Sequence, residues 1–346
     1  MIKRITAGLL AGTLVLALAA CTATVPISPT DSSGLGSETI HVGIAYDSAG
    51  RGDLSFNDAA GAGLDRAKKE LLVQATEATT EAENDQARAE TLRGLAQGGS
   101  NPVIAVGFLY ATAVGTVGKE FPDTLFAIID DDSVSADNVV SLLFSEEQGS
   151  YLVGVAAARA TRTNRVGFVG GVDVALIHKF EAGYTAGVRS VNPGITVDVR
   201  YLSKPPDFSG FGAPDKGTAA ARQLISNGAD VIYAAAGGSG SGVFEAVAAA
   251  PAKVWAIGVD SDQYASAPEA VKPHILTSML KRVDNGVFQE IQAFAKGDRE
   301  GGSKRYDLKV DGVGYATSNT ALNRYKDDME KARYRILSGA VKVPSK

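Results

Sequence analysis

Residues 50–58 read Gly-Arg-Gly-Asp-Leu-Ser-Phe-Asn-Asp and separate two segments of different periodicity. The apolar run 41–46 predicts a buried strand, whereas apolar residues recur at helical spacing over 62–72. The stretch therefore predicts the loop between a first strand and a first helix. In open α/β sheets such a loop lies at the carboxyl end of a strand, where ligands bind. Phe56 and Asn57 mark it as a candidate binding loop.

Strand and helix patterns alternate along most of the chain. Further strand patterns lie at 102–107, 124–129, 139–144, 165–171, 195–201, 229–234, 253–259 and 275–281. Helical patterns between them predict parallel sheets covered on both faces. The same plan runs from about 40 to 145 and again from 146 to 262. The 346 residues are long enough for two cores, so we expect two doubly wound α/β lobes.

The first forty residues predict export and anchoring rather than part of the fold. Lys3 and Arg4 precede an apolar run that ends in Leu-Ala-Ala before Cys21, the chain's one cysteine. This pattern predicts a lipoprotein signal peptide over 1–20 and acylation of Cys21. The alternative is an ordinary secretory signal with an incidental cysteine. Residues 21–39 are rich in Thr, Ser, Pro and Gly and predict a flexible tether. We expect a lipid-anchored protein on the extracytoplasmic face of the cell membrane.

Composition and motifs argue against several functions. The net charge is −5 and no basic patch is apparent, so no nucleic acid partner is expected. The three histidines lack metal-ligand spacing, and no Gly-x-Ser-x-Gly motif is present. We therefore expect no catalytic set, metal or cofactor. The glycines of 237–242 resemble a dinucleotide loop, but Val243 breaks the spacing, so they are expected to let backbone amides approach a ligand.

Two further features allow more than one interpretation. The acidic run 130–132 is interpreted as a cation site, a solvated turn, or, preferably, a turn that directs one carboxylate into a cleft. Phe56 and Phe211 each lie in a polar, glycine-bearing loop, one in each half of the chain. Each ring either fills the core of its own lobe or forms one side of a clamp on a flat ligand. Stacking on an aromatic ring contributes about 1–3 kcal/mol per base.

Several motifs in order resemble the basic membrane protein family, whose members include purine nucleoside receptors. They are Ser55-Phe56-Asn57, Phe126-Ala127-Ile128-Ile129-Asp130, Lys216-Gly217, Gly228-Ala229-Asp230-Val231-Ile232, Ala236-Gly237-Gly238, Ile257-Gly258-Val259-Asp260-Ser261-Asp262-Gln263 and Thr277-Ser278-Met279-Leu280-Lys281. The resemblance implies a type I periplasmic-binding-protein fold, with two lobes joined by three hinge strands. It implies a first lobe of 40–145 and 263–303 and a second of 146–262 and 304–346. Ala49, Gly52 and Leu54 depart from the family's usual loop.

The resemblance also implies a site between the lobes. Phe56 and Phe211 should sandwich a purine, and Asp47 and Asp130, with Asn57 beside them, should accept hydrogen bonds from the ligand. Asp260 should take the ribose hydroxyls, helped by Lys281 and the backbone near Gly238. The implied function is capture of a purine nucleoside for the membrane permease of an ABC importer, without catalysis. The alternatives are a sugar-binding protein of the same fold, an exported nucleoside-processing enzyme or NAD-dependent oxidoreductase, and an adhesin or signalling lipoprotein.

Overall fold

The computed structural model describes residues 39–47, 49–80 and 82–346. The signal peptide, Cys21 and the tether up to residue 38 lie outside the described residues. Residues 39–346 form one compact unit that contains two six-stranded sheets. In this part of the chain, no helix has the length and apolar character needed to cross a lipid bilayer.

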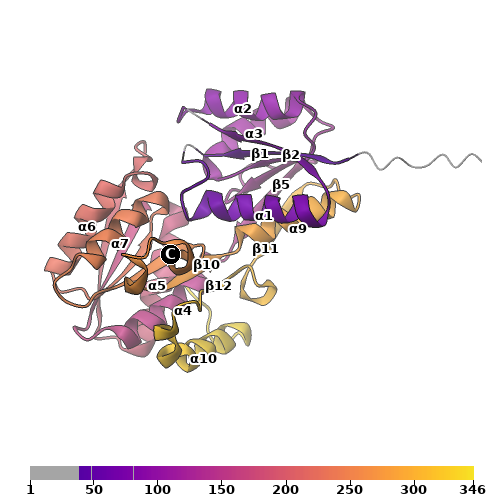
Figure 1. Cartoon of the computed structure of the whole chain (residues 1–346). Helices are drawn as coiled ribbons and strands as arrows, with labels where there is room; N and C mark the ends of the chain where they lie inside the picture. The colour runs from indigo at the N-terminus through magenta and orange to yellow at the C-terminus, as the bar shows by residue number, and fades with distance from the viewer. Residues whose placement is uncertain (1–38, 48, 81) are drawn as a thin grey trace, which may run out of the picture. The chain divides into compact units, whose positions relative to one another are not determined.

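The first lobe contains the sheet with strand order β11-β5-β4-β3-β1-β2, in which all pairs are parallel. Strand β1 is buried from Val42 to Tyr46, as expected for a strand covered on both faces. Figure 1 shows helices on both sides of this sheet. The elements are β1 (His41–Tyr46), α1 (Phe56–Glu70), β2 (Gln74–Thr79), α2 (Asp85–Gln97), β3 (Val103–Ala105), η1 (Phe108–Tyr110), α3 (Ala111–Glu120), β4 (Phe126–Ile129), β5 (Val139–Phe144), α9 (Val283–Ala295) and β11 (Gly302–Tyr306).

The second lobe repeats this order as β12-β10-β9-β8-β6-β7, with β12 antiparallel at the edge. The repetition confirms the expected pair of doubly wound lobes. The elements are α4 (Glu146–Ala160), β6 (Arg165–Val172), α5 (Ala175–Val191), β7 (Thr196–Ser203), η2 (Ser209–Phe211), α6 (Pro214–Ser226), β8 (Val231–Ala235), η3 (Gly237–Ser239), α7 (Gly240–Ala248), β9 (Trp255–Asp260), α8 (Gln263–Ser266), η4 (Lys272–His274), β10 (Ile275–Lys281), η5 (Leu308–Val310), β12 (Val313–Tyr315), η6 (Thr320–Tyr325) and α10 (Lys326–Leu337).

The chain passes between the sheets three times: after Phe144, after Lys281 and after Tyr306. Two predicted lobe boundaries therefore need correction. Strand β10 pairs with β9, so the return to the first lobe begins near 282 instead of 263. Strand β11 pairs with β5, so the first lobe extends to Tyr306 instead of 303. The physical reason is that the local sequence pattern of a buried strand does not indicate which of the two sheets the strand joins.

Close packing of α4 against α5 explains why these helices are rich in small residues. A side chain at Gly154 would lie 2.3 Å from the Tyr184 carbonyl oxygen, and one at Gly187 would lie 2.1 Å from the Tyr151 carbonyl oxygen. Only glycine permits this separation. Helix α4, which follows the first chain crossing, is buried on nearly every face and so lies in the interior of the second lobe.

Candidate functional site

The carboxyl ends of strands from both sheets line one cavity. Its empty volume, including the part open to solvent, is about 730 Å³. All eight residues expected to bind ligand line it: Asp47, Phe56, Asn57, Asp130, Phe211, Gly238, Asp260 and Lys281. The structure thus brings the expected set together from six separate segments. Their roles toward a ligand stay predictions.

The two aromatic rings expected to form a clamp both border this cavity. Phe56 begins α1 in the first lobe, and Phe211 ends η2 in the second. Each ring is half-buried rather than enclosed in its own lobe's core. A side chain at Gly171 would lie 2.5 Å from the Phe211 ring, so this glycine leaves the space that the ring occupies. The geometry favours the clamp interpretation over the core-filling one.

Asp47 and Asp53 fix the loop that carries Phe56. Asp47 accepts hydrogen bonds from the Ala49 backbone at 3.0 Å and from the Asn57 amide at 2.8 Å. Asp53 accepts from the backbone N–H groups of Ser55, Asn57 and Asp58, and so caps α1. Burial raises the pKa of both carboxyl groups, and these hydrogen bonds oppose the rise.

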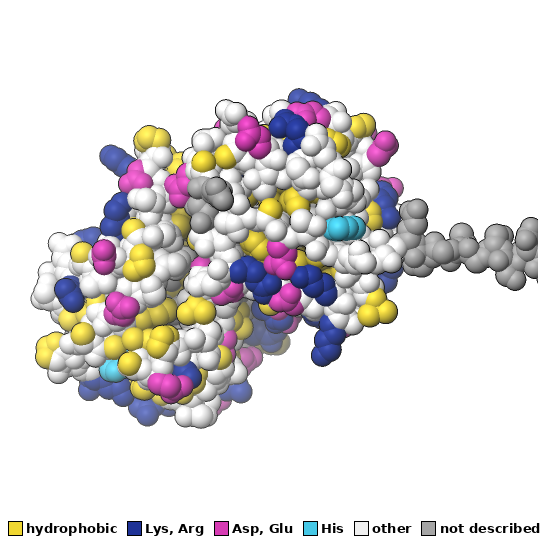
Figure 2. Space-filling view, turned by 45° about the horizontal axis from the view of Figure 1, so that its top comes forward, with side chains coloured by type: hydrophobic (Ala, Val, Ile, Leu, Met, Phe, Trp, Pro, Cys, Tyr) yellow, Lys and Arg dark blue, Asp and Glu magenta, His cyan; other side chains and the backbone are white. Residues whose placement is uncertain are grey.

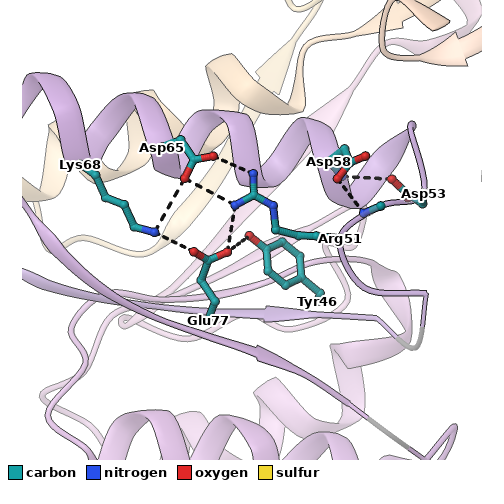
Figure 3. A network of polar contacts seen from close by, with 8 residues as sticks. Tyr46, Arg51, Asp53, Asp58, Asp65, Lys68 and Glu77 are labelled. Atoms are coloured by element: carbon teal, nitrogen blue, oxygen red, sulfur yellow. Dashed lines mark hydrogen bonds and ion pairs between the residues drawn. The ribbon is translucent and has the colours of Figure 1, made fainter. Parts of the chain in front are cut away.

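The loop is also tied down on its outer side by Arg51. Its guanidinium contacts Asp65 of α1 at 2.6 Å and Glu77 of β2 at 3.1 Å (Figure 3). Glu77 accepts a further hydrogen bond from the Tyr46 hydroxyl at 2.8 Å. A side chain at Gly61 would collide with the guanidinium at 2.6 Å, so glycine makes room for this contact. The network holds the loop against α1 and β2.

Lys281 is the central cation of the cavity. Its ammonium lies 2.6 Å from Asp130 Oδ2 and 3.1 Å from Glu146 Oε1, and its side chain is 2% exposed. The Phe56 and Phe144 ring centroids each lie 5.2 Å from the ammonium. Burial disfavours its charge, but the surrounding carboxylates outweigh burial and raise the pKa of Lys281.

Asp260 has a different environment from the one expected. Lys281 contacts Asp130 and Glu146 directly, whereas Asp260 Oδ2 accepts a hydrogen bond from Ser55 Oγ at 2.6 Å. Burial raises the pKa of Asp260 to about 6, although the charge of Lys281 and the Ser55 hydroxyl oppose the rise. The expectation that Lys281 offsets the charge of Asp260 therefore holds through its electrostatic field and not through direct contact.

Among the residues that line the cavity, two buried side-chain oxygen atoms have no hydrogen-bond partner. They are Asn57 Oδ1 and Asp130 Oδ1, and both residues line the cavity. A buried polar atom without a partner is unfavourable by about 1–3 kcal/mol. Both atoms accept hydrogen bonds, so the site is suited to a ligand that presents N–H or O–H groups. Among the described residues, no group of three or more His, Cys, Asp or Glu side chains is arranged to hold a metal ion.

Sequence reasoning missed three contributors. Glu146, fully buried, anchors Lys281 but resembles an ordinary acidic residue in the first turn of a helix. Ser55 belongs to a quoted motif, but nothing local indicates its contact with Asp260, 205 residues away. Phe108 lines the cavity and its ring centroid lies 6.1 Å from that of Phe208 in the second lobe. An aromatic residue after a buried strand, the signal that identified Phe56, would have found Phe108.

Comparison with known proteins places this site in a family. Residues 40–346 match the family model described as ABC transporter substrate-binding protein PnrA-like. A CD4+ T-cell-stimulating antigen of Listeria innocua is 36% identical over 325 residues, covering 90% of this chain and 89% of that protein. The ABC transporter nucleoside-binding protein BmpA of Lactococcus lactis is 34% identical over 329 residues, covering 91% and 92%.

A solved structure agrees with this assignment. The solute-binding protein of an ABC transporter system from Aeropyrum pernix superposes with a TM-score of 0.77 at 28% identity, covering 89% of this chain and 94% of that one. The two lobes, their parallel sheets and the three chain crossings are those of the type I periplasmic-binding-protein fold. The chain belongs to the PnrA-like family of ABC transporter substrate-binding proteins.

Proposed function

We propose that this protein captures a purine nucleoside between its lobes and delivers it to the membrane permease of an ABC importer. The observation that carries the proposal is one cavity bordered by Phe56 and Phe211 from opposite lobes, with unpartnered acceptors at Asn57 and Asp130. Two rings suit a planar base, and the acceptors suit its N–H groups. The nucleoside-binding relative from Lactococcus lactis supports the same ligand class.

Asp260 is assigned to the ribose. A carboxylate accepts hydrogen bonds from two neighbouring hydroxyls, and a site built to bind them rejects analogues that lack them. The backbone near Gly238 supports this end of the ligand because a residue without Cβ permits close approach. Asp47 and Asp130 are assigned to the base with Asn57. The cavity binds, and no chemical step is assigned to it.

The protein acts at the extracytoplasmic face of the membrane, held there by lipid on Cys21. Support comes from the sequence of residues 1–21, an apolar run that ends in small residues before this cysteine. Labelling of expressing cells with a palmitate analogue should mark the wild-type protein and fail to mark Cys21→Ser.

On the face shown in Figure 2, acidic and basic side chains lie beside one another near the middle of the picture.

Calorimetric titration tests the ligand class. The purified protein should bind guanosine, inosine or adenosine with one site, and D-ribose or D-galactose much more weakly. Phe211→Ala should weaken nucleoside binding about 5- to 150-fold through lost stacking. The matched control is Phe208→Ala, in the same loop, whose ring contacts Phe108 and does not border the cavity. Its effect should be clearly smaller.

The other candidate functions give different results in the same series. Heat with a sugar and none with any nucleoside would replace the proposal with a sugar-binding protein of this fold. Release of hypoxanthine from inosine by the protein would indicate an enzyme instead. Binding of a nucleoside that Phe211→Ala leaves unchanged would remove the ring clamp from the proposal.

A further inference from the structure

The hydroxyl of Ser55 is not used to cap the helix that it precedes. Ser55 occupies the N-cap position of α1, where a serine side chain ordinarily accepts a backbone N–H of the first turn. Here Asp53 accepts the N–H groups of Asn57 and Asp58 instead, and Figure 3 shows Asp53 close to Asp58. The capping carboxylate leaves the Ser55 hydroxyl available for another contact.

That contact crosses from one lobe to the other. Ser55 Oγ donates to Asp260 Oδ2 at 2.6 Å, a short distance typical of a hydroxyl bound to a carboxylate. Ser55 is fully buried and Asp260 is 8% exposed. Neighbouring groups join the same two segments: Ser261 Oγ donates to the Ser55 carbonyl oxygen at 2.9 Å, and Gln263 Nε2 donates to the Leu54 carbonyl oxygen at 3.0 Å.

We propose that Ser55 is a positioning residue for recognition of the ligand's vicinal hydroxyls. Its hydroxyl holds one oxygen of Asp260 and leaves the other carboxylate oxygen for the ligand. This inference rests on the assignment of Asp260 to the ribose. Because the donor belongs to the first lobe and the carboxylate to the second, the acceptor takes its final orientation only when the lobes are closed. Closure therefore completes the site as well as enclosing the ligand.

The electrostatic surroundings of Asp260 give the proposal a second observable. The charged groups that act on this carboxylate are Lys281 on β10, Asp53 in the α1 loop and Asp130 at the end of β4. Lys281 and the Ser55 hydroxyl favour the ionised form, whereas burial and the two other aspartates disfavour it. Removal of the hydroxyl should therefore move the acidic limb of the binding profile to higher pH.

The test compares guanosine with 2′,3′-dideoxyguanosine by calorimetry in four proteins: wild type, Ser55→Ala, Ser55→Thr and Ser261→Ala. Ser55→Ala should lower the preference for guanosine about tenfold and raise the pH midpoint of binding. It should leave binding of the dideoxy analogue nearly unchanged. Ser55→Thr, which keeps the hydroxyl, should restore both properties. Ser261→Ala also removes a hydrogen bond between the lobes, but not one to Asp260, and should keep the wild-type preference.

The outcomes separate this inference from the ligand assignment. If wild type prefers guanosine and Ser55→Ala keeps the same preference, the role of Ser55 is wrong and the assignment of Asp260 stands. If Ser261→Ala and Ser55→Ala lower the preference equally, Ser55 only joins the lobes. If wild type binds both compounds equally, both assignments fail. In an Asp260→Ala background, which removes the acceptor for Ser55, Ser55→Ala should change the preference no further, so the coupling is tested without relying on a single variant.

Discussion

Asp130 and Asp260 occupy equivalent places in the two lobes and are held differently. Counted from edge strand β2, Asp130 directly follows the fourth strand of the first sheet; counted from edge strand β7, Asp260 ends the fourth strand of the second. Each has a left-handed backbone, with φ of +71° for Asp130 and +63° for Asp260. Residues other than glycine adopt this conformation rarely, and aspartate is among those that tolerate it. Asp130 contacts the ammonium of Lys281, whereas Asp260 contacts the neutral hydroxyl of Ser55.

In both cases the partner comes from the opposite lobe. Lys281 ends a strand of the second sheet and reaches Asp130 of the first. Ser55 lies in the first lobe and reaches Asp260 of the second. Burial raises the pKa of both carboxyl groups, so the two aspartates differ in their partners: Asp130 belongs to an ion cluster, whereas Asp260 is bound by a neutral hydroxyl. Substitutions of the partners and of the two aspartates should therefore have different effects on stability and on binding.

Removal of the cation should be the most damaging change. Lys281→Met leaves Asp130 and Glu146 buried without their ammonium, and loss of one partner of a buried pair destabilises by about 3–5 kcal/mol. The free energy of unfolding in urea measures the effect. Adding Asp130→Asn and Glu146→Gln to Lys281→Met should recover much of the loss. A loss below about 1 kcal/mol for Lys281→Met would show that the cluster is not what holds Asp130.

The charge of Asp260 should make stability depend on pH. Its pKa in the folded protein is about 6, above the ordinary value of 3.8. The folded state therefore binds this proton more tightly than the unfolded state does. The resulting stabilisation is complete below about pH 4 and is lost as pH rises through about 6, by about 3 kcal/mol in all.

Unfolding of wild type and Asp260→Asn at several pH values isolates this effect, because the other carboxyl groups are common to both proteins. The stability of wild type relative to Asp260→Asn should fall by about 3 kcal/mol between pH 4 and pH 7. A difference that stays constant over this range would contradict the raised pKa. Asp260→Asn keeps the shape of the side chain and an acceptor for Ser55.

Nucleoside affinity should fall in mild acid through the same group. Hydroxyl donors favour the ionised carboxylate, so binding to protonated Asp260 requires loss of its proton. With a pKa of about 6 for Asp260, affinity should be about fourfold lower at pH 5.5 than at pH 7.5. Asp260→Asn should flatten this part of the profile. Asp130→Asn should weaken binding but keep this part of the pH profile, since it leaves Asp260 unchanged. The opposite pattern would exchange the two roles.

The smallest effect is expected for Arg51, which supports the loop behind Ser55. Its side chain is 38% exposed, so solvent screening limits the contribution of its ion pairs to about 1 kcal/mol or less. Arg51→Ala should lower nucleoside affinity a few-fold, because the loop that carries Phe56 is held less firmly. Arg93→Ala removes an ion pair with Glu120 away from the site and should leave affinity unchanged. If Arg51→Ala and Arg93→Ala change the affinity equally, the ion pairs of Arg51 have no role in binding.

Local pattern was enough to find much of this architecture. Alternating strand and helix patterns indicate two α/β lobes, and cavity-lining residues lie at the ends of buried strands, as Asp130 and Asp260 do. The strands at 139–144 and 275–281 have the expected bounds. These features depend on the periodicity of neighbouring residues, which is visible in one sequence.

Pairings between distant residues were not accessible in the same way. The sheet that β10 joins depends on its pairing with β9, and the predicted lobe of this strand is wrong for that reason. Glu146 carries the same local signal as an exposed residue at a helix start, although it is fully buried. The exchange of partners between the lobes, with Lys281 on Asp130 and Ser55 on Asp260, follows from three-dimensional packing alone.

The central claim is that rings from opposite lobes hold a purine while Asp260 holds its ribose. A crystal structure of the protein with guanosine tests it most directly. We expect the base to stack between Phe56 and Phe211, with its N–H groups directed at Asp130 and Asn57. The ribose hydroxyls should lie on Asp260, with Ser55 still bound to it. A ligand seated outside the two rings, or one whose ribose faces Asp130 and whose base faces Asp260, would contradict it.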